Sequence, residues 1–154
     1  MSNFDLSVII DNLPFLWQGL QLSLFLTLLA IIGGIILGTF LALMRLSGIA
    51  PLSLAAAGYV NLIRSVPLIL VIFWFYFLVP LALGRPIGGF YSALIAFVMF
   101  EAAYYSEIIR AGIQSVRKGQ VQAGQATGLS YWQIQRYIVL PQAFRNMIPI
   151  LVTQ

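Results

Sequence analysis

The side chains that usually carry out catalysis are scarce in this chain. Its 154 residues include no cysteine and no histidine, which excludes thiol chemistry, histidine-based acid–base catalysis and the common zinc sites. The single lysine, Lys118, is followed by Gly119, whereas a phosphate-binding P-loop needs Ser or Thr directly after its lysine. We therefore nominate no catalytic residue, no metal ligand and no cofactor. If the protein works in a process that consumes ATP, we expect the ATP to bind to another subunit.

Two charged residues in or beside apolar runs are candidates for lining a polar path. Glu101 lies within the apolar run 87–109, where a carboxylate is costly unless it faces water or a partner. It either faces such a path or makes a structural hydrogen bond. Arg64 stands at the start of another apolar run and is either part of the path or an interfacial anchor. Glu107 has a simpler interpretation, because Arg110 lies three residues further along and can pair with it.

A polar, glycine-rich segment, Gln122–Pro141, interrupts the apolar sequence. Gly128 is suited to a left-handed helix end. Ser130 is followed three residues later by Gln133, which is the spacing of a capping box at the start of a helix. The segment is therefore predicted to form two short helices joined at a corner, with Pro141 ending the second.

The two predicted helices differ in their side chains. Apolar residues at helical spacing predict one face of the second helix: Tyr131, Ile134 and Ile138. Small residues in and after the first helix would let another protein approach the backbone closely: Ala123, Gly124, Ala126 and Gly128. A compact helical segment of this kind can transmit force as a lever.

The composition indicates an integral membrane protein, because 61% of the residues are hydrophobic and only 8% are charged, against about 25% in soluble domains. We expect one all-α transmembrane domain over residues 1–154. The apolar runs predict three complete spans and the beginning of a fourth, at about 18–43, 62–83, 87–109 and 143–154. In the first span, small residues recur every fourth position and predict close helix packing, either within the bundle or with another subunit: Ala30, Gly34, Gly38 and Ala42.

The basic residues predict the orientation. With the N-terminus outside, only Arg85 faces outward, and seven basic residues face the cytoplasm: Arg45, Arg64, Arg110, Arg117, Lys118, Arg136 and Arg145. This arrangement places residues 111–142 in the cytoplasm. It also explains the net charge of +4 without a nucleic-acid partner.

The polar segment resembles the EAA loop of the membrane subunits of bacterial ABC importers. That motif reads E-A-A, three residues, G, nine residues, I, one residue, L-P. The matching positions here are Gln122, Ala123, Gly124, Gly128, Ile138, Leu140 and Pro141. Gln122 replaces the usual Glu and Gly124 the second Ala, so a salt bridge from the first position becomes at most a hydrogen bond.

The run Glu101–Val116 resembles the polar amino acid branch of these permeases, and most of all its glutamate/aspartate importers. The resemblance implies a helical permease bundle in a bacterial inner membrane, with coupling helices that dock on an ATP-binding subunit. It also implies a second permease subunit, a periplasmic substrate-binding protein and alternating access, without enzymatic activity in this chain. Family members continue through two more spans, so the chain resembles the N-terminal portion of a permease.

Two alternatives remain open. An ion-coupled secondary transporter is suggested by Glu101 within a span, although it would not need the basic cytoplasmic segment. A truncated membrane scaffold that does not transport is suggested by the short last run. Dependence of uptake on ATP distinguishes the first alternative from an ABC importer, and uptake by the reconstituted protein distinguishes the second.

Overall fold

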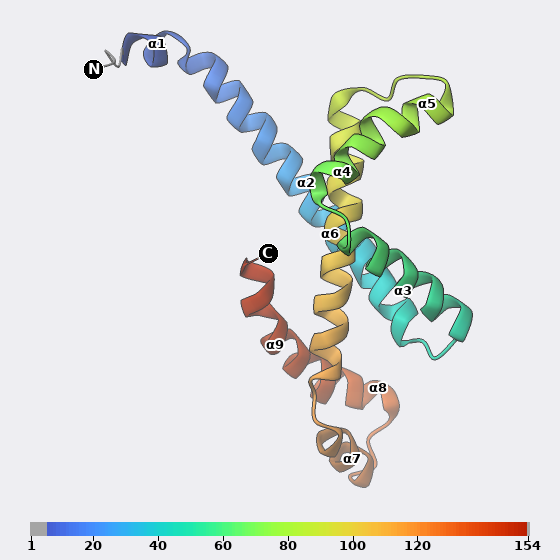
Figure 1. Ribbon diagram of the computed structural model, residues 1–154. Helices are drawn as coiled ribbons and strands as arrows, with labels where there is room; N and C mark the ends of the chain where they lie inside the picture. Colours follow the sequence, from blue (N-terminus) through green and yellow to red (C-terminus); the bar gives the residue numbers. More distant parts are fainter. Residues whose placement is uncertain (1–5, 154) are drawn as a thin grey trace.

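The computed structural model describes residues 6–153, and this part of the chain is helical without strands (Figure 1). The helices are α1 Leu6–Asp11, α2 Leu13–Leu46, α3 Ala50–Arg64, α4 Leu68–Phe73, α5 Val79–Leu83, α6 Gly89–Gln114, α7 Lys118–Ala126, α8 Tyr131–Ile134 and α9 Leu140–Thr153. Two π-helical turns join neighbouring helices: η1 Trp74–Leu78 and η2 Gln135–Val139. The all-α fold class is confirmed.

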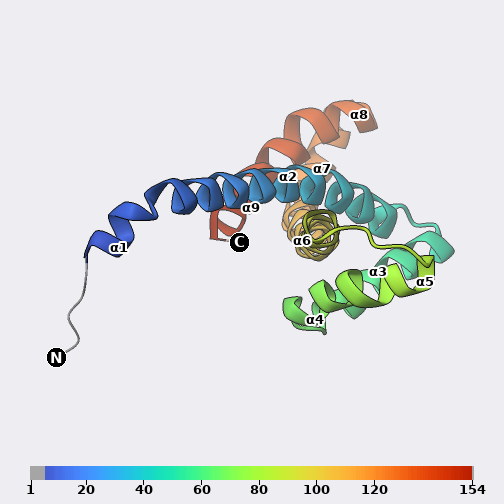
Figure 2. The same cartoon turned by 90° about the horizontal axis from the view of Figure 1, so that it is seen from above.

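Helix α6 is the centre of the structure. It packs against α2, α3, α4 and α9, and the view along its axis shows α2 passing on one side and α4 and α5 on the other (Figure 2). Helices α2 and α6 are long and apolar enough to cross a membrane. A third candidate span exists if α3 and the helical stretch Leu68–Leu83 count as one bent span.

The small residues of α2 pack inside this chain, against α6. Ala30, Gly34, Gly38 and Ala42 are all buried. A Cβ atom on Gly38 would lie only 2.9 Å from the backbone oxygen of Ala102, so glycine is needed for the two helices to approach this closely. Of the two expectations for these residues, packing within the bundle is the one that the structure shows.

The helix expected over 62–83 is not continuous. Helix α3 ends at Arg64, and the chain bends by 106° before the stretch Leu68–Leu83. Proline explains the break, because Pro67 has no N–H to continue the α3 ladder and disfavours helical geometry at Val66. The carbonyl of Pro67 then accepts from Leu70 N at 3.0 Å, which starts α4.

Pro141 does not end its helix, contrary to the sequence-based expectation. The chain runs from α8 through η2 into α9, and Pro141 is the second residue of α9. In η2, Leu140 N–H bonds to the carbonyl of Gln135, five residues back. We attribute the continuity to this wider turn, because π-turns relieve the clash and missing donor that a proline brings to a helix. The last apolar run therefore begins at Leu140 and is continuous with the polar segment.

Candidate functional site

The two-helix loop, residues 115–139, follows the end of α6 and continues into α9 (Figure 1). Its first helix, α7, ends at Ala126. Gly128 follows two residues later, with a φ of +79°. Gly128 N donates to the carbonyl of Gln125 at 3.0 Å, and Leu129 N donates to that of Gly124 at 3.1 Å. This pair of bonds is a Schellman motif, which requires the left-handed residue. The predicted left-handed helix end is confirmed.

The second helix of the loop begins with the predicted capping box. Ser130 Oγ accepts from the backbone N–H of Gln133 at 3.4 Å. In return, Ser130 N donates to Gln133 Oε1 at 2.8 Å. Together the two motifs fix both sides of the corner between α7 and α8, so the loop has a defined shape and can act as one piece.

The loop has an apolar interior. Ile134 and Val139 are buried there together with Val116, and Val121, Leu129 and Ile138 pack against them. Gly124 is buried beneath the second helix, and a Cβ atom on it would lie 2.6 Å from Cδ1 of Ile138. At Gly124, the group that approaches the backbone closely is therefore a side chain of the loop itself and not another protein. Tyr131 does not share this interior, because it is 65% exposed.

The residues matched to the family motif accordingly divide into two groups. Gly124 is buried and Ile138 is half-buried, so both shape the loop. The others are exposed and available to a partner: Gln122, Ala123, Gly128, Leu140 and Pro141. Trp132, which was not among the predicted site residues, is 79% exposed beside Tyr131 on α8. The sequence feature that could have indicated an exposed contact residue is a large aromatic side chain, Trp132, just after the Ser130 helix cap in a polar segment.

The two stems of the loop are joined at its base. Asn146 Nδ2, from α9, donates to Ser115 Oγ at 2.8 Å, and Ser115 Oγ donates to the carbonyl of Gly112 at 2.7 Å. A Cβ atom on Gly112 would overlap the side chain of Met147, which shows how closely α6 and α9 pack there. Displacement of the loop would therefore move the ends of both helices.

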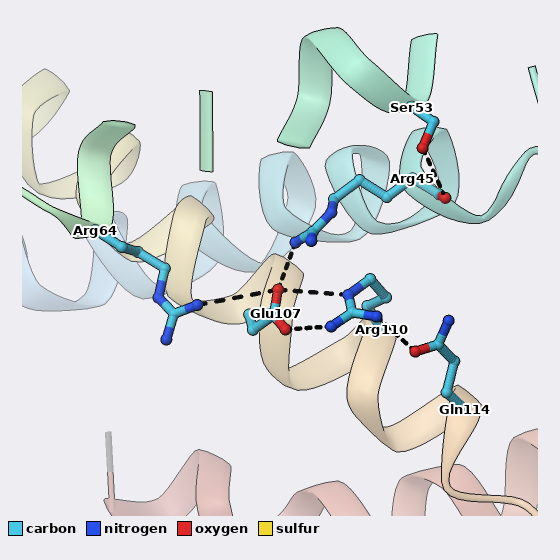
Figure 3. A network of polar contacts seen from close by, with 6 residues as sticks. All are labelled: Arg45, Ser53, Arg64, Glu107, Arg110 and Gln114. Carbon is cyan, nitrogen blue, oxygen red and sulfur yellow. Dashed lines mark hydrogen bonds and ion pairs between the residues drawn. The ribbon is translucent and has the colours of Figure 1, made fainter. Parts of the chain in front are cut away.

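Beside this base lies an ion cluster that the sequence revealed only in part. The Glu107 cluster consists of Glu107, Arg45, Arg64 and Arg110 (Figure 3). Glu107 accepts hydrogen bonds from Arg45 of α2 and from Arg110 of its own helix. The predicted pairing of Glu107 with Arg110 is confirmed, whereas the contact with Arg45 joins distant parts of the sequence and was not foreseen.

The two candidates for a polar path lie in different surroundings. Arg64 has its Nη1 atom 4.0 Å from the Glu107 carboxylate and its guanidinium carbon 5.1 Å from the centre of the Tyr104 ring. Glu101 is half-buried and lines a cavity of about 320 Å³ together with Thr27 of α2 and Leu151 of α9. Arg64 therefore belongs to the Glu107 cluster, and Glu101 to a cavity between three helices.

Comparisons with known proteins point to one family. Residues 30–154 match the sequence profile of the family described as "Binding-protein-dependent transport system inner membrane component". The chain is 50% identical over its whole length to 72% of the glutamate/aspartate import permease protein GltK of Escherichia coli O6:H1. It is 39% identical, over 99% of its length, to 69% of the arginine transport system permease protein ArtQ of Bacillus subtilis.

Solved structures agree with this assignment. A crystal structure of an amino acid ABC transporter with histidines superposes with a TM-score of 0.90 at 35% identity, over 99% of this chain and 71% of that one. A MetNI methionine ABC transporter in an inward-facing conformation gives a TM-score of 0.63 at 21% identity, which supports the fold alone. With a profile match over most of its length and a relative at 50% identity, the chain belongs to the family of inner membrane components of binding-protein-dependent transport systems.

Proposed function

We propose that this chain is the translocation subunit of an ATP-driven importer for acidic amino acids. Its own residues form the path and the coupling loop, while ATP binds to a separate subunit. The relative at 50% identity is a glutamate/aspartate import permease, whereas the arginine permease is 39% identical. This order of identity supports glutamate or aspartate as the substrate.

The observation that carries the proposal is the two-helix loop. It is closed by a Schellman motif and a capping box, packed around its own interior and joined at its base to α6 and α9. Its exposed residues include Gln122, Ala123 and Trp132. A rigid, exposed loop attached to two helices of the bundle is suited to dock on an ATPase and to pass its movement into the membrane.

The orientation follows from the basic residues. With the N-terminus outside, the loop and the Glu107 cluster lie on the cytoplasmic side, where ATP is available. A substrate-binding protein would deliver the amino acid on the opposite side, near the segment between α5 and α6. A second permease subunit, either a copy of this chain or a related one, would complete the path, which opens alternately to the two sides.

Reconstitution tests this proposal. The permease is assembled in proteoliposomes with an ATPase subunit and a substrate-binding protein, and uptake of labelled glutamate, aspartate, arginine and glutamine is measured. We expect uptake of the two acidic amino acids only, and only with hydrolysable ATP. The matched control is an ATPase variant that binds ATP without hydrolysing it.

The other outcomes each contradict part of the proposal. Uptake driven by an ion gradient in the absence of ATP would identify a secondary transporter. Binding of the ATPase without uptake of any amino acid would indicate a scaffold. ATP-dependent uptake of arginine or glutamine alone would keep the transporter class and overturn the acidic substrate.

A further inference from the structure

The carboxylate of Glu107 is where three helices meet. It receives Arg45 from α2 and Arg110 from α6, and the guanidinium of Arg64 from α3 lies 4.0 Å away (Figure 3). The side chain of Arg45 is 14% exposed, and those of Glu107 and Arg110 are 25% exposed. The cluster is therefore largely withdrawn from water, and its electrostatic interactions are only weakly screened.

The charges of the cluster do not balance, because three guanidinium groups surround one carboxylate. Without Glu107 the three cations would repel one another, and Arg45 would keep a largely buried charge without its acceptor. The arginines belong to three different helices, so this repulsion would push the ends of α2, α3 and α6 apart. Glu107 is thus the group that allows these helix ends to converge.

The Glu107 cluster is also connected to the two-helix loop. Arg110 Nη1 donates to Gln114 Oε1 at 2.5 Å, and Gln114 is the last residue of α6. The next residue, Ser115, accepts from Asn146 of α9. Polar contacts, linked by the peptide bond between Gln114 and Ser115, therefore lead from the base of the loop to the arginines of α2 and α3.

We propose that Glu107 is a positioning residue that makes α2 and α3 follow the two-helix loop when the ATPase moves it. This inference rests on the proposed function. Arg45 makes the stronger contact with Glu107, because it is the most buried member of the cluster and donates directly to the carboxylate. Arg64 is the looser partner, since it is 39% exposed and lies 4.0 Å away. The α2 contact should consequently contribute more to coupling than the α3 contact.

The test measures amino acid taken up per ATP hydrolysed, in proteoliposomes that contain the permease, the ATPase and the substrate-binding protein. Glu107→Gln keeps the size of the side chain and removes its charge. We expect it to insert and to bind the ATPase, but to lower uptake per ATP by a factor of roughly 5 to 150, the range of typical coupling free energies. Asp11→Asn is the matched control, because it converts a carboxylate outside the cluster to an amide, and it should leave the ratio unchanged.

A charge exchange distinguishes positioning from general stability. Arg45→Glu combined with Glu107→Arg keeps three cations and one anion in the cluster and restores the α2–α6 pair. Because the new guanidinium at position 107 would then stand beside Arg110 and Arg64, we expect the double variant to recover part of the uptake per ATP that Arg45→Glu alone loses. Arg45→Gln should lower the ratio more than Arg64→Gln does.

Several results would overturn the inference. Wild-type uptake per ATP in Glu107→Gln would do so. If Glu107→Gln fails to insert, the charge exchange decides: an inserted double variant that recovers nothing over Arg45→Glu contradicts positioning, and recovery supports it. Failure of the proposed function would be visible in the wild-type protein, whose uptake would not depend on ATP. Failure of this inference would be visible only in variants of a wild type that is coupled to ATP.

Discussion

Gly124 and Ile138, at two positions of the family motif, pack against each other inside the two-helix loop. A Cβ atom on Gly124 would lie 2.6 Å from Cδ1 of Ile138 and 3.1 Å from Cγ1 of Ile134. The spacing between the glycine and the isoleucine is therefore explained by the packing of α7 against the following helix. These two residues shape the loop from the inside, and its exposed surface is formed by their neighbours.

Gly124→Val tests this packing. The added methyl groups would overlap Ile138 and push α7 away from the second helix, at a cost of about 1–3 kcal/mol. We expect faster proteolysis within the loop and weaker co-purification of the ATPase, with normal membrane insertion. Gly119→Val is the matched control on the same helix, because a Cβ atom on Gly119 meets nothing within 4 Å. Equal behaviour of the two variants would contradict the packing argument.

Gly128→Val tests the corner of the loop. The φ of +79° at Gly128 strains a side-chain-bearing residue, at about 1–2 kcal/mol for the left-handed conformation, although nothing surrounds the position. We expect the ATPase to bind weakly, or to hydrolyse ATP without uptake, while insertion stays normal. Gly128→Asn should be tolerated better, since asparagine adopts this conformation more readily. If Gly128→Val binds the ATPase and takes up amino acid per ATP as the wild type does, the left-handed conformation at Gly128 is not needed for coupling.

The corner of the loop was predictable because its signals are local. The Ser130–Gln133 cap and the left-handed Gly128 depend on residues a few positions apart, and both are present. The effect of Pro141 was predicted wrongly, because its clash is relieved by a wider turn in the preceding residues, which no residue type signals. The break at Pro67 was available from the sequence, but the continuous apolar run on either side of it favoured a single helix.

Contacts between distant residues limited the prediction of the site. Glu107 was paired with Arg110 because the two are three residues apart on one helix. Its contact with Arg45 depends on how α2 crosses α6, and that crossing is set by Gly34 and Gly38 against α6. The small residues predicted close packing but not the partner helix, so the Glu107 cluster could not be assembled from the sequence.

Gly38→Ala tests the crossing of α2 and α6. The new methyl group would lie 2.9 Å from the backbone oxygen of Ala102 and 2.8 Å from Cβ of Tyr105, neither of which can rotate away. We expect a lower melting temperature in detergent, corresponding to about 1–3 kcal/mol of overpacking. Gly19→Ala on the same helix is the control, because a Cβ atom there meets nothing within 4 Å. A melting temperature of Gly38→Ala equal to that of the control would contradict this account.

Cysteine labelling tests the orientation. The chain contains no cysteine, so each introduced cysteine is a unique target. Gly88 precedes α6 and Lys118 begins α7, at opposite ends of the α6 helix. With the N-terminus outside, Gly88→Cys should react with a membrane-impermeant maleimide in intact cells, and Lys118→Cys only after the membrane is opened. Reaction of both variants from the same side would overturn the topology.

Glu101→Gln tests the polar path. Glu101 lines the cavity between α2, α6 and α9, and the change to Gln removes its charge while keeping the size of the side chain. If the carboxylate faces the path, we expect uptake to fall by about tenfold, or about 1.4 kcal/mol, while the ATPase still co-purifies. Asp11→Asn should leave uptake unchanged. Loss of insertion or assembly in Glu101→Gln would instead assign the carboxylate a structural hydrogen bond, and wild-type uptake would remove Glu101 from the path.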